Sequence, residues 1–110
     1  MVFKYIESST FLYNANTMKL YFYSISGGVL AHAYYPSKSS KGGDMHFDDG
    51  ETFKYKTGSG MDLTSVTLHE AGHALGLKHD PTKGSIMVPW YSGQTTLGPN
   101  DIKTIKGLYA

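Results

Sequence analysis

The strongest constraint on this chain is one short stretch in which three histidines recur at fixed spacing. It begins with His69-Glu70-Ala71-Gly72-His73 and continues to Gly76 and His79. Residues four apart lie on one face of a helix, so the imidazoles of His69 and His73 can reach a common point. Glycine tolerates the left-handed turn that ends a helix, so Gly76 can bring the chain back with His79. The stretch therefore predicts a helix, a turn and three convergent histidines.

Three histidine nitrogens and one open position form the ligand set of a catalytic zinc ion. Zinc lowers the pKa of a bound water to about 7, so a hydroxide-like nucleophile exists at neutral pH. Glu70 follows the first ligand and is predicted to take the proton of the zinc-bound water and pass it to a leaving amine. A helix can carry two such histidines by chance, and the later glycine and third histidine favour a metal site.

The remainder of the chain predicts an α+β fold in which most strands precede the main helix. Runs of aromatic and β-branched residues predict strands at 19–25, 29–35 and 44–48, with a shorter strand at 2–6 or 10–13. Polar and glycine-rich segments predict loops at 37–43 and 55–62.

Two helices are expected after these strands. Apolar residues near helical spacing predict the main helix at 63–77, with Asp62 or Thr64 as its N-cap. A second helix is predicted at 100–108, with Asn100 as its N-cap.

Composition narrows the function classes. The 110 residues are expected to form one domain, 1–110. They carry a net charge of +1 with no basic run, which disfavours nucleic-acid binding. There is no apolar run of membrane-spanning length and no signal peptide, so no membrane contact is expected. Without cysteine, a zinc ion must be held by histidine or carboxylate.

The chain resembles the catalytic domain of the matrixins, the matrix-metalloproteinase branch of the metzincins. The histidine stretch matches the metzincin signature H-E-x-x-H-x-x-G-x-x-H. The resemblance extends over these segments: 30–36, 42–48, 67–79, 87–91, 97–102 and 107–109. It implies a metzincin-like fold, with a small twisted sheet that is mixed or mostly antiparallel, an active-site helix, a Met-turn and a short C-terminal helix. Matrixins have a further strand and a long helix ahead of residue 19, so we expect a shortened form.

The same resemblance implies a substrate site. Leu30 and Ala31 would offer backbone groups to an extended peptide, which would pair along that strand edge. An apolar pocket for the residue after the scissile bond would be lined by Pro89 and Tyr91, with Val66 nearby; Tyr91 could equally be a surface aromatic.

Met87 matches the Met-turn beneath such zinc sites, and the alternative is that it simply fills the core. Asp80 follows the third histidine, and its carboxylate is expected to orient the Met-turn region through a hydrogen bond.

The resemblance also implies a structural zinc site and calcium sites, but this chain matches only part of their ligands. His32 and His46 match two ligands of a structural zinc, and the alternative is that they form hydrogen bonds on the strand surface. Asp44, Asp48 and Glu51 match carboxylates of calcium sites, although calcium requires six to eight oxygens. Otherwise the acidic residues at 48–51 are expected to form a solvated turn.

The leading hypothesis is therefore a secreted, monomeric zinc endopeptidase that cleaves extended peptides or proteins next to an apolar residue. The alternative is a minimal zinc-binding scaffold with weak or no peptidase activity, motivated by the shortened front part. A third hypothesis, a zinc hydrolase that acts on a non-peptide bond, arises because the ligand set alone does not choose a substrate.

Overall fold

The computed structural model describes residues 2–6, 20–25 and 28–109. In chain order the elements are β1 (Val2–Ile6), β2 (Leu20–Tyr23), β3 (Val29–Tyr34), β4 (Met45–Asp48), β5 (Phe53–Lys54), β6 (Met61–Asp62), α1 (Leu63–Ala74) and α2 (Pro99–Tyr109). The strand considered at 10–13 lies outside the described residues. Most strands precede the main helix, which confirms the α+β prediction.

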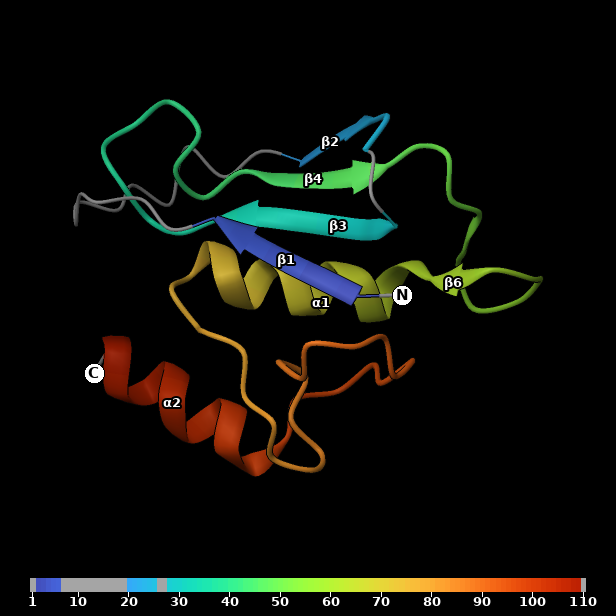
Figure 1. The fold of residues 1–110 in the computed structure, drawn as a ribbon. Coiled ribbons are helices and arrows are strands. Elements are labelled where there is room, and N and C mark those ends of the chain that lie inside the picture. The colour runs from blue at the N-terminus through green and yellow to red at the C-terminus, as the bar shows by residue number, and fades with distance from the viewer. Residues whose placement is uncertain (1, 7–19, 26–27, 110) are drawn as a thin grey trace.

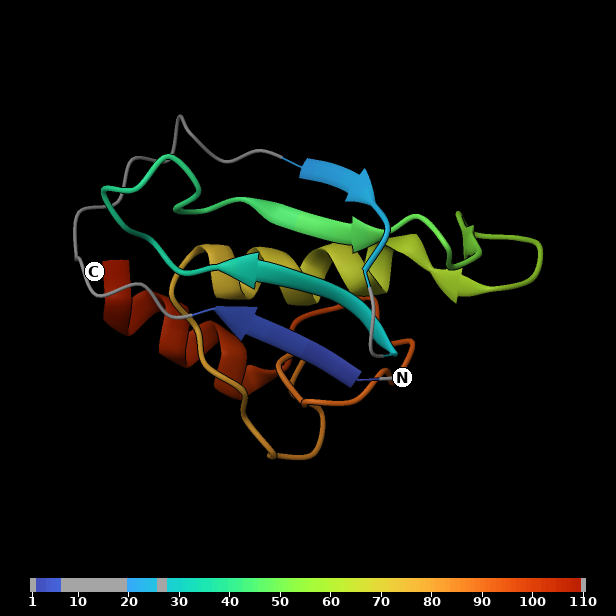
Figure 2. The same ribbon diagram turned by 45° about the horizontal axis from the view of Figure 1, so that its top comes forward.

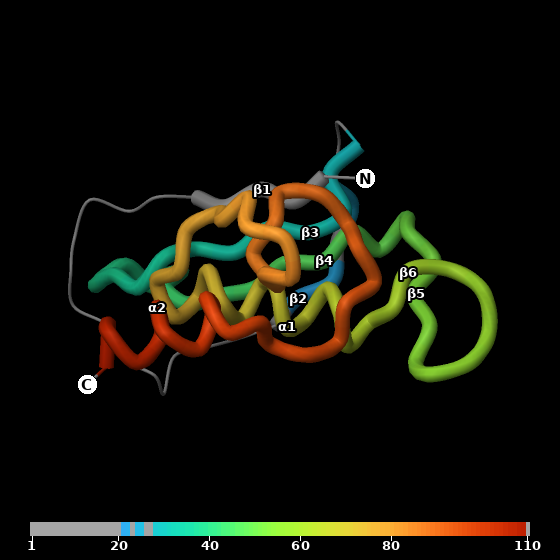
Figure 3. The backbone as a smooth tube through the Cα atoms, turned by 90° about the horizontal axis from the view of Figure 1, so that it is seen from below, coloured from blue at the N-terminus to red at the C-terminus, as the bar shows by residue number. Residues whose placement is uncertain are grey.

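Four of the strands form one mixed sheet in the order β1-β3-β4-β2. The central pair β3 and β4 is antiparallel, whereas β1 runs parallel to β3 and β2 runs parallel to β4. Figure 1 shows this sheet above α1, with α2 and its preceding loop below. Seen from below in Figure 3, the loop that follows α1 passes in front of the sheet. The histidine stretch is thus placed between two layers.

The main core lies between β3, β4 and α1. Leu30, Ala31, Ala33 and Phe47 are fully buried against the helix residues Val66 and Ala74. Small alanines on the strand allow α1 to approach the sheet closely, and Phe47 fills the volume beside them. This packing fixes the helix that carries His69 and His73.

Different features fix the two ends of α1: a side-chain cap at its start and a left-handed glycine after its end. The carboxylate of Asp62 accepts a hydrogen bond from the amide of Ser65 at 3.0 Å, which confirms Asp62 as the N-cap. The helix ends at Ala74 and not at 77 as predicted. Gly76 has a φ of +105°, and the amide of Leu77 bonds to the carbonyl of Gly72 at 2.8 Å. These bonds close the last turn, so the left-handed glycine ends the helix earlier than the apolar pattern suggests.

Two further predictions are corrected. The segment predicted as loop at 55–62 ends in β6, which pairs with β5 in a small parallel ladder. The second helix begins at Pro99, so Asn100 lies inside it and is not its N-cap. The amide of Gly98 bonds instead to the carboxylate of Asp101 at 2.7 Å, as in a capping box, and proline favours the first helical position.

A close contact joins α1 to the loop below it. Met87 is 1% exposed, and a Cβ added to Gly72 would overlap its Sδ atom. Glycine costs helix stability, roughly 1 kcal/mol relative to alanine, so this position is occupied by glycine for packing and not for helix formation. Met87 therefore packs directly under the turn that joins the first two histidines.

We expect Gly72→Ala to reduce the free energy of unfolding by roughly 1–3 kcal/mol, because the new methyl group would overpack this contact. Met87→Ala alone should cost about 2–5 kcal/mol through its cavity. Since the methyl group added by Gly72→Ala would fill part of that cavity, the double variant should lose less than the sum of the two. Denaturant unfolding of the metal-free chain measures all three.

Gly107→Ala is the control. Gly107 also lies in a helix, and an added Cβ there meets nothing within 4 Å. This substitution should leave stability unchanged or raise it by up to about 1 kcal/mol. Strict additivity of the Gly72 and Met87 variants would contradict the contact.

Candidate metal centre

The three histidines of the signature come together at the C-terminal half of α1. One ring nitrogen from each of His69, His73 and His79 lies within 4.8 Å of the others. The Nε2 atoms of His69 and His73 are 3.1 Å apart. Two nitrogens on a tetrahedral zinc ion, at about 2.0–2.1 Å each, are separated by about 3.3–3.4 Å. Within residues 2–6, 20–25 and 28–109 this is the only group of three or more such ligands.

Backbone carbonyls fix which nitrogen of each ring carries the proton. Nδ1 of His69 lies 2.6 Å from the carbonyl oxygen of Ile86, and Nδ1 of His73 lies 2.7 Å from that of Leu77. A carbonyl can only accept, so Nδ1 must donate and Nε2 of the neutral ring keeps its lone pair. The two lone pairs then face each other, which suits a shared cation and not a hydrogen bond between them.

Burial keeps these rings in the form that binds a metal. It lowers the pKa of His69 to about 3, with the neighbouring His73 adding to the effect. It also lowers the pKa of His73 to about 4, although the bond to Leu77 opposes the shift. The pKa of His79 is lowered by burial too. The imidazoles are therefore neutral at pH 7 and available as ligands.

Glu70 provides an independent test of fit. Its side chain is fully buried, and neither carboxylate oxygen has a hydrogen-bond partner among the described residues. Burial raises its pKa well above the ordinary value. A buried carboxyl group without partners is costly unless a cation or a bound water completes its surroundings. The three histidines and this carboxylate together fit a zinc ion and its water.

Comparison with known proteins agrees with this geometry. A sequence profile of the matrixin family matches residues 10–110. Matrix metalloproteinase-25 of Homo sapiens is 52% identical over 69 residues, which are 61% of this chain and 12% of that protein. The hatching enzyme of Paracentrotus lividus is 45% identical over 86 residues, covering 76% of this chain and 14% of its own length. The chain belongs to the matrixin family.

Matrilysin of Felis catus is 42% identical to this matrixin over 87 residues, which are 76% of the chain and 33% of matrilysin. The chain thus spans between 12% and 33% of the length of these three relatives. The family implies a metzincin fold, and the mixed sheet with two helices agrees with it. It also implies a catalytic zinc, for which the histidine triad is present.

The turn below the metal centre is held by Asp101, whose role the sequence did not reveal. Asp101 is 2% exposed and accepts hydrogen bonds from Ser85 Oγ at 2.5 Å, Ile86 N at 2.7 Å and Gly98 N at 2.7 Å. Ile86 in turn accepts from the His69 ring. A carboxylate on α2 therefore orients His69, a predicted zinc ligand on α1, through one peptide unit. The capping-box spacing was the only local signal for it.

Asp80 does not act as predicted. Its carboxylate accepts hydrogen bonds from Thr82 N at 2.9 Å and from Asn100 Nδ2. The contact with the Met-turn is made by the Asp80 backbone amide, which bonds to the carbonyl of Met87 at 2.9 Å. The carboxylate therefore shapes its own loop and ties it to α2.

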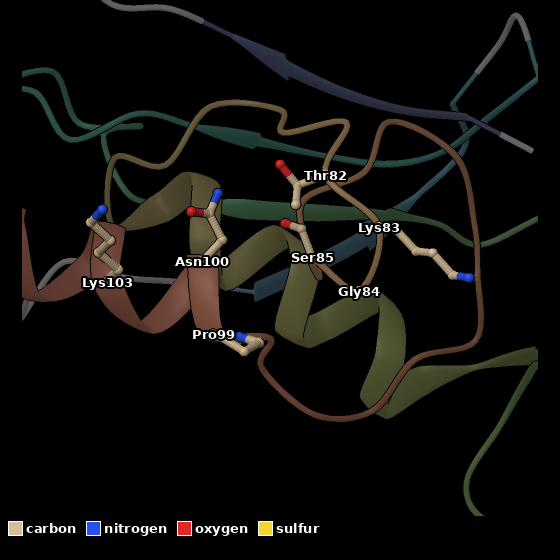
Figure 4. Close-up of a pocket in the computed structure, with 7 residues that line it drawn as sticks. All are labelled: Thr82, Lys83, Gly84, Ser85, Pro99, Asn100 and Lys103. Atoms are coloured by element: carbon tan, nitrogen blue, oxygen red, sulfur yellow. The ribbon is translucent and has the colours of Figure 1, made fainter.

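A hollow of about 300 Å³ lies beside this region, between the 82–85 loop and the start of α2. Figure 4 shows its lining, with Lys83 of the loop at one side, Lys103 of α2 at the other, and Asn100, also on α2, between them. None of the three histidines lines it, so it is separate from the metal centre.

The other histidines lie on neighbouring strands. Nε2 of His32 is 2.9 Å from Nδ1 of His46, so the two rings form the hydrogen bond of the alternative interpretation. Burial and the charge of Lys41 lower the pKa of His46. The described residues supply no third ligand that would complete a group with them. A structural zinc at this pair remains a prediction without support from the geometry.

The acidic residues proposed for calcium are mostly used within the fold. Asp48 is buried, and its Oδ1 accepts hydrogen bonds from Gly50 N at 3.0 Å and Ile25 N at 3.3 Å. Asp44 is buried as well, whereas Glu51 is half-buried. The solvated turn is therefore wrong for Asp48, since this carboxylate closes the turn after β4. Calcium binding stays an untested prediction.

The residues predicted to contact substrate divide into two groups. Pro89 and Tyr91 are half-buried on the loop after the Met-turn, and the Tyr91 hydroxyl accepts a hydrogen bond from Asp62 N at 2.8 Å. Val66 is fully buried in the core against β3, so its side chain offers no surface to a ligand. Leu30 and Ala31 lie on β3, and their side chains are fully buried too, which leaves only backbone groups for a peptide.

Replacing Asp101 with alanine should lower the free energy of unfolding by about 2–5 kcal/mol, because three buried donors lose their acceptor. Zinc affinity should fall as well, since the Ile86 carbonyl would no longer be held against His69. Asp101→Asn should lower both the free energy of unfolding and the zinc affinity by less than Asp101→Ala does. Its oxygen keeps part of the hydrogen bonding, whereas its NH₂ group must face one donor. Unfolding curves and zinc competition with a chromogenic chelator measure both effects.

Lys103→Ala is the matched control on the same helix, because Lys103 is exposed. It should change stability by no more than about 0.5 kcal/mol and leave zinc affinity unchanged. Equal effects of the Asp101 and Lys103 variants would contradict the proposed support of the zinc ligand.

Proposed function

We propose that this matrixin is a zinc-dependent endopeptidase that hydrolyses extended peptides next to an apolar residue. The observation that carries the proposal is the buried carboxylate of Glu70, without a protein partner, on the same helix as two converging histidines. A zinc-binding scaffold would need the histidines but would gain nothing from a buried, unsatisfied carboxylate.

The proposed roles follow from the positions of the side chains. His69, His73 and His79 would hold zinc through the nitrogens that face one another. When bound, zinc supplies Lewis acidity, which brings the pKa of a coordinated water to about 7 and polarises the substrate carbonyl. Glu70 would accept the proton of the attacking water and return it to the leaving amine.

Substrate binding is proposed along two surfaces. An extended peptide would pair with the β3 edge along the stretch that includes Leu30 and Ala31, through the backbone only. The side chain after the scissile bond would enter an apolar pocket beside Pro89 and Tyr91. The bond from Asp62 to the Tyr91 hydroxyl fixes this loop to the start of α1 and supports its role as a pocket wall.

The proposal also covers where the protein acts and in which oligomeric state. The resemblance to matrixins favours a secreted protein that acts as a monomer. Of the helices that the structure describes, none is long and apolar enough to cross a membrane.

The test is Glu70→Gln in the zinc-loaded chain. This substitution keeps the size of the side chain and removes its basicity, so kcat for a fluorogenic peptide with an apolar residue after the cleaved bond should fall by roughly 10²–10⁴-fold. Zinc content should stay at one ion per chain, since Glu70 is not a ligand. Mass spectrometry under native conditions measures the zinc, and fluorescence measures kcat.

Two outcomes would contradict the proposal. Cleavage that survives in Glu70→Gln would remove the proposed base. A wild-type chain that binds one zinc but does not cleave a broad set of peptides would instead favour the scaffold.

A further inference from the structure

The outer edge of β3 is occupied by the chain itself. β1 pairs in parallel with β3, with Phe3 opposite Ala31 and Ile6 opposite Tyr34. In Figures 1 and 2, β1 runs along the side of β3 that β4 leaves open. The position that an added substrate strand would take is therefore filled by residues 2–6.

The backbone pattern shows which groups of β3 face β1. The amide of Tyr34 bonds to the carbonyl of Asp44 at 2.9 Å, and its carbonyl accepts from Gly43 at 3.1 Å, both on the β4 side. Backbone groups of successive residues in a strand point to opposite sides. The groups of Ala33 and Ala31 thus point toward β1. These are the amides and carbonyls that an extended peptide on this edge would use.

This edge lies beside the metal centre. β3 packs directly on α1, and Tyr35, which follows β3, has its ring centroid 6.0 Å from that of His73. β1 runs toward the same end, since its last residue lies opposite Tyr34. A peptide that reaches the histidine triad in extended form needs backbone partners along this edge, because no other strand edge of the described sheet borders α1 in this way.

We propose that β1 is an internal competitor for the substrate edge, so that it must leave β3 before a peptide can pair there. The inference rests on the proposed function for the edge along which substrate binds, but the occupancy of that edge can be measured without catalysis. A five-residue edge strand forms few bonds and opens at a small free-energy cost compared with global unfolding. β1 would therefore tune the affinity for substrate and not abolish activity.

If β1 competes with substrate, removing β1 from the edge should lower KM. A protein that binds substrate only in its open fraction has an apparent dissociation constant raised by the inverse of that fraction, whereas the reaction of bound substrate is unaffected. If about one-tenth of the molecules are open, removing the competition should lower KM by about tenfold with little change in kcat.

The register offers a matched pair of variants. Tyr5 lies opposite Ala33, and in parallel pairing a residue bonds to the neighbours of the one opposite it. The amide of Lys4 therefore points toward β3 and that of Tyr5 points away. Proline removes the amide at either site, so Lys4→Pro should release β1 while Tyr5→Pro should largely preserve the pairing.

We expect Lys4→Pro to lower KM for the fluorogenic peptide by about tenfold, with kcat within about twofold of the wild type, and Tyr5→Pro to change KM much less. Hydrogen exchange of the Ala31 and Ala33 amides, followed by NMR, should accelerate in Lys4→Pro only. Zinc content and thermal unfolding of both variants confirm that they are folded.

Unchanged KM together with unchanged amide exchange in Lys4→Pro would overturn the proposal. If no variant and no wild-type chain cleaves peptide, the proposed function fails, and amide exchange still decides whether β1 covers the edge. Should Lys4→Pro not fold, a synthetic peptide with the sequence of residues 2–6 is tested on the wild-type chain. Competitive inhibition by it, and none by the same peptide with proline in place of lysine, supports the proposal; no inhibition by either peptide overturns it.

Discussion

The rest of the site depends on one constraint: the Nε2 atoms of His69 and His73 lie 3.1 Å apart, with their lone pairs facing each other. Both rings must donate through Nδ1 to backbone carbonyls, so neither Nε2 can donate to the other. Buried in this way, the pair is repulsive without a cation. Zinc with nitrogen ligands removes the repulsion, and a metal of this kind contributes directly to the stability of a small domain.

The surrounding fold keeps these rings from relaxing apart. Alanines on β3 let α1 lie close to the sheet, and Met87 packs against Gly72 on the other side of the helix. Asp101 holds the backbone of Ile86, whose carbonyl orients His69. The site is thus supported from the sheet, from the loop that carries Met87 and from α2, which are far apart in the sequence.

The sequence predicted what depends on local spacing. Four-residue spacing placed His69 and His73 on one helix face, and a left-handed glycine turned the chain toward His79. It could not predict the role of Asp101 or the direction of the Asp80 carboxylate, because both depend on how the loop folds back onto α2. The pairing of β1 with β3 was also out of reach, since alternation identifies a strand but not its partner. Val66 was placed near a pocket although its side chain is needed in the core.

The central claim is that three imidazole nitrogens and one exchangeable oxygen bind a single zinc ion. X-ray absorption spectroscopy at the zinc edge of the loaded chain tests it directly. The account predicts four-coordinate zinc, with three imidazole nitrogens at about 2.0–2.1 Å and one oxygen ligand. Fewer than three imidazoles, or a six-coordinate shell dominated by oxygen, would contradict it.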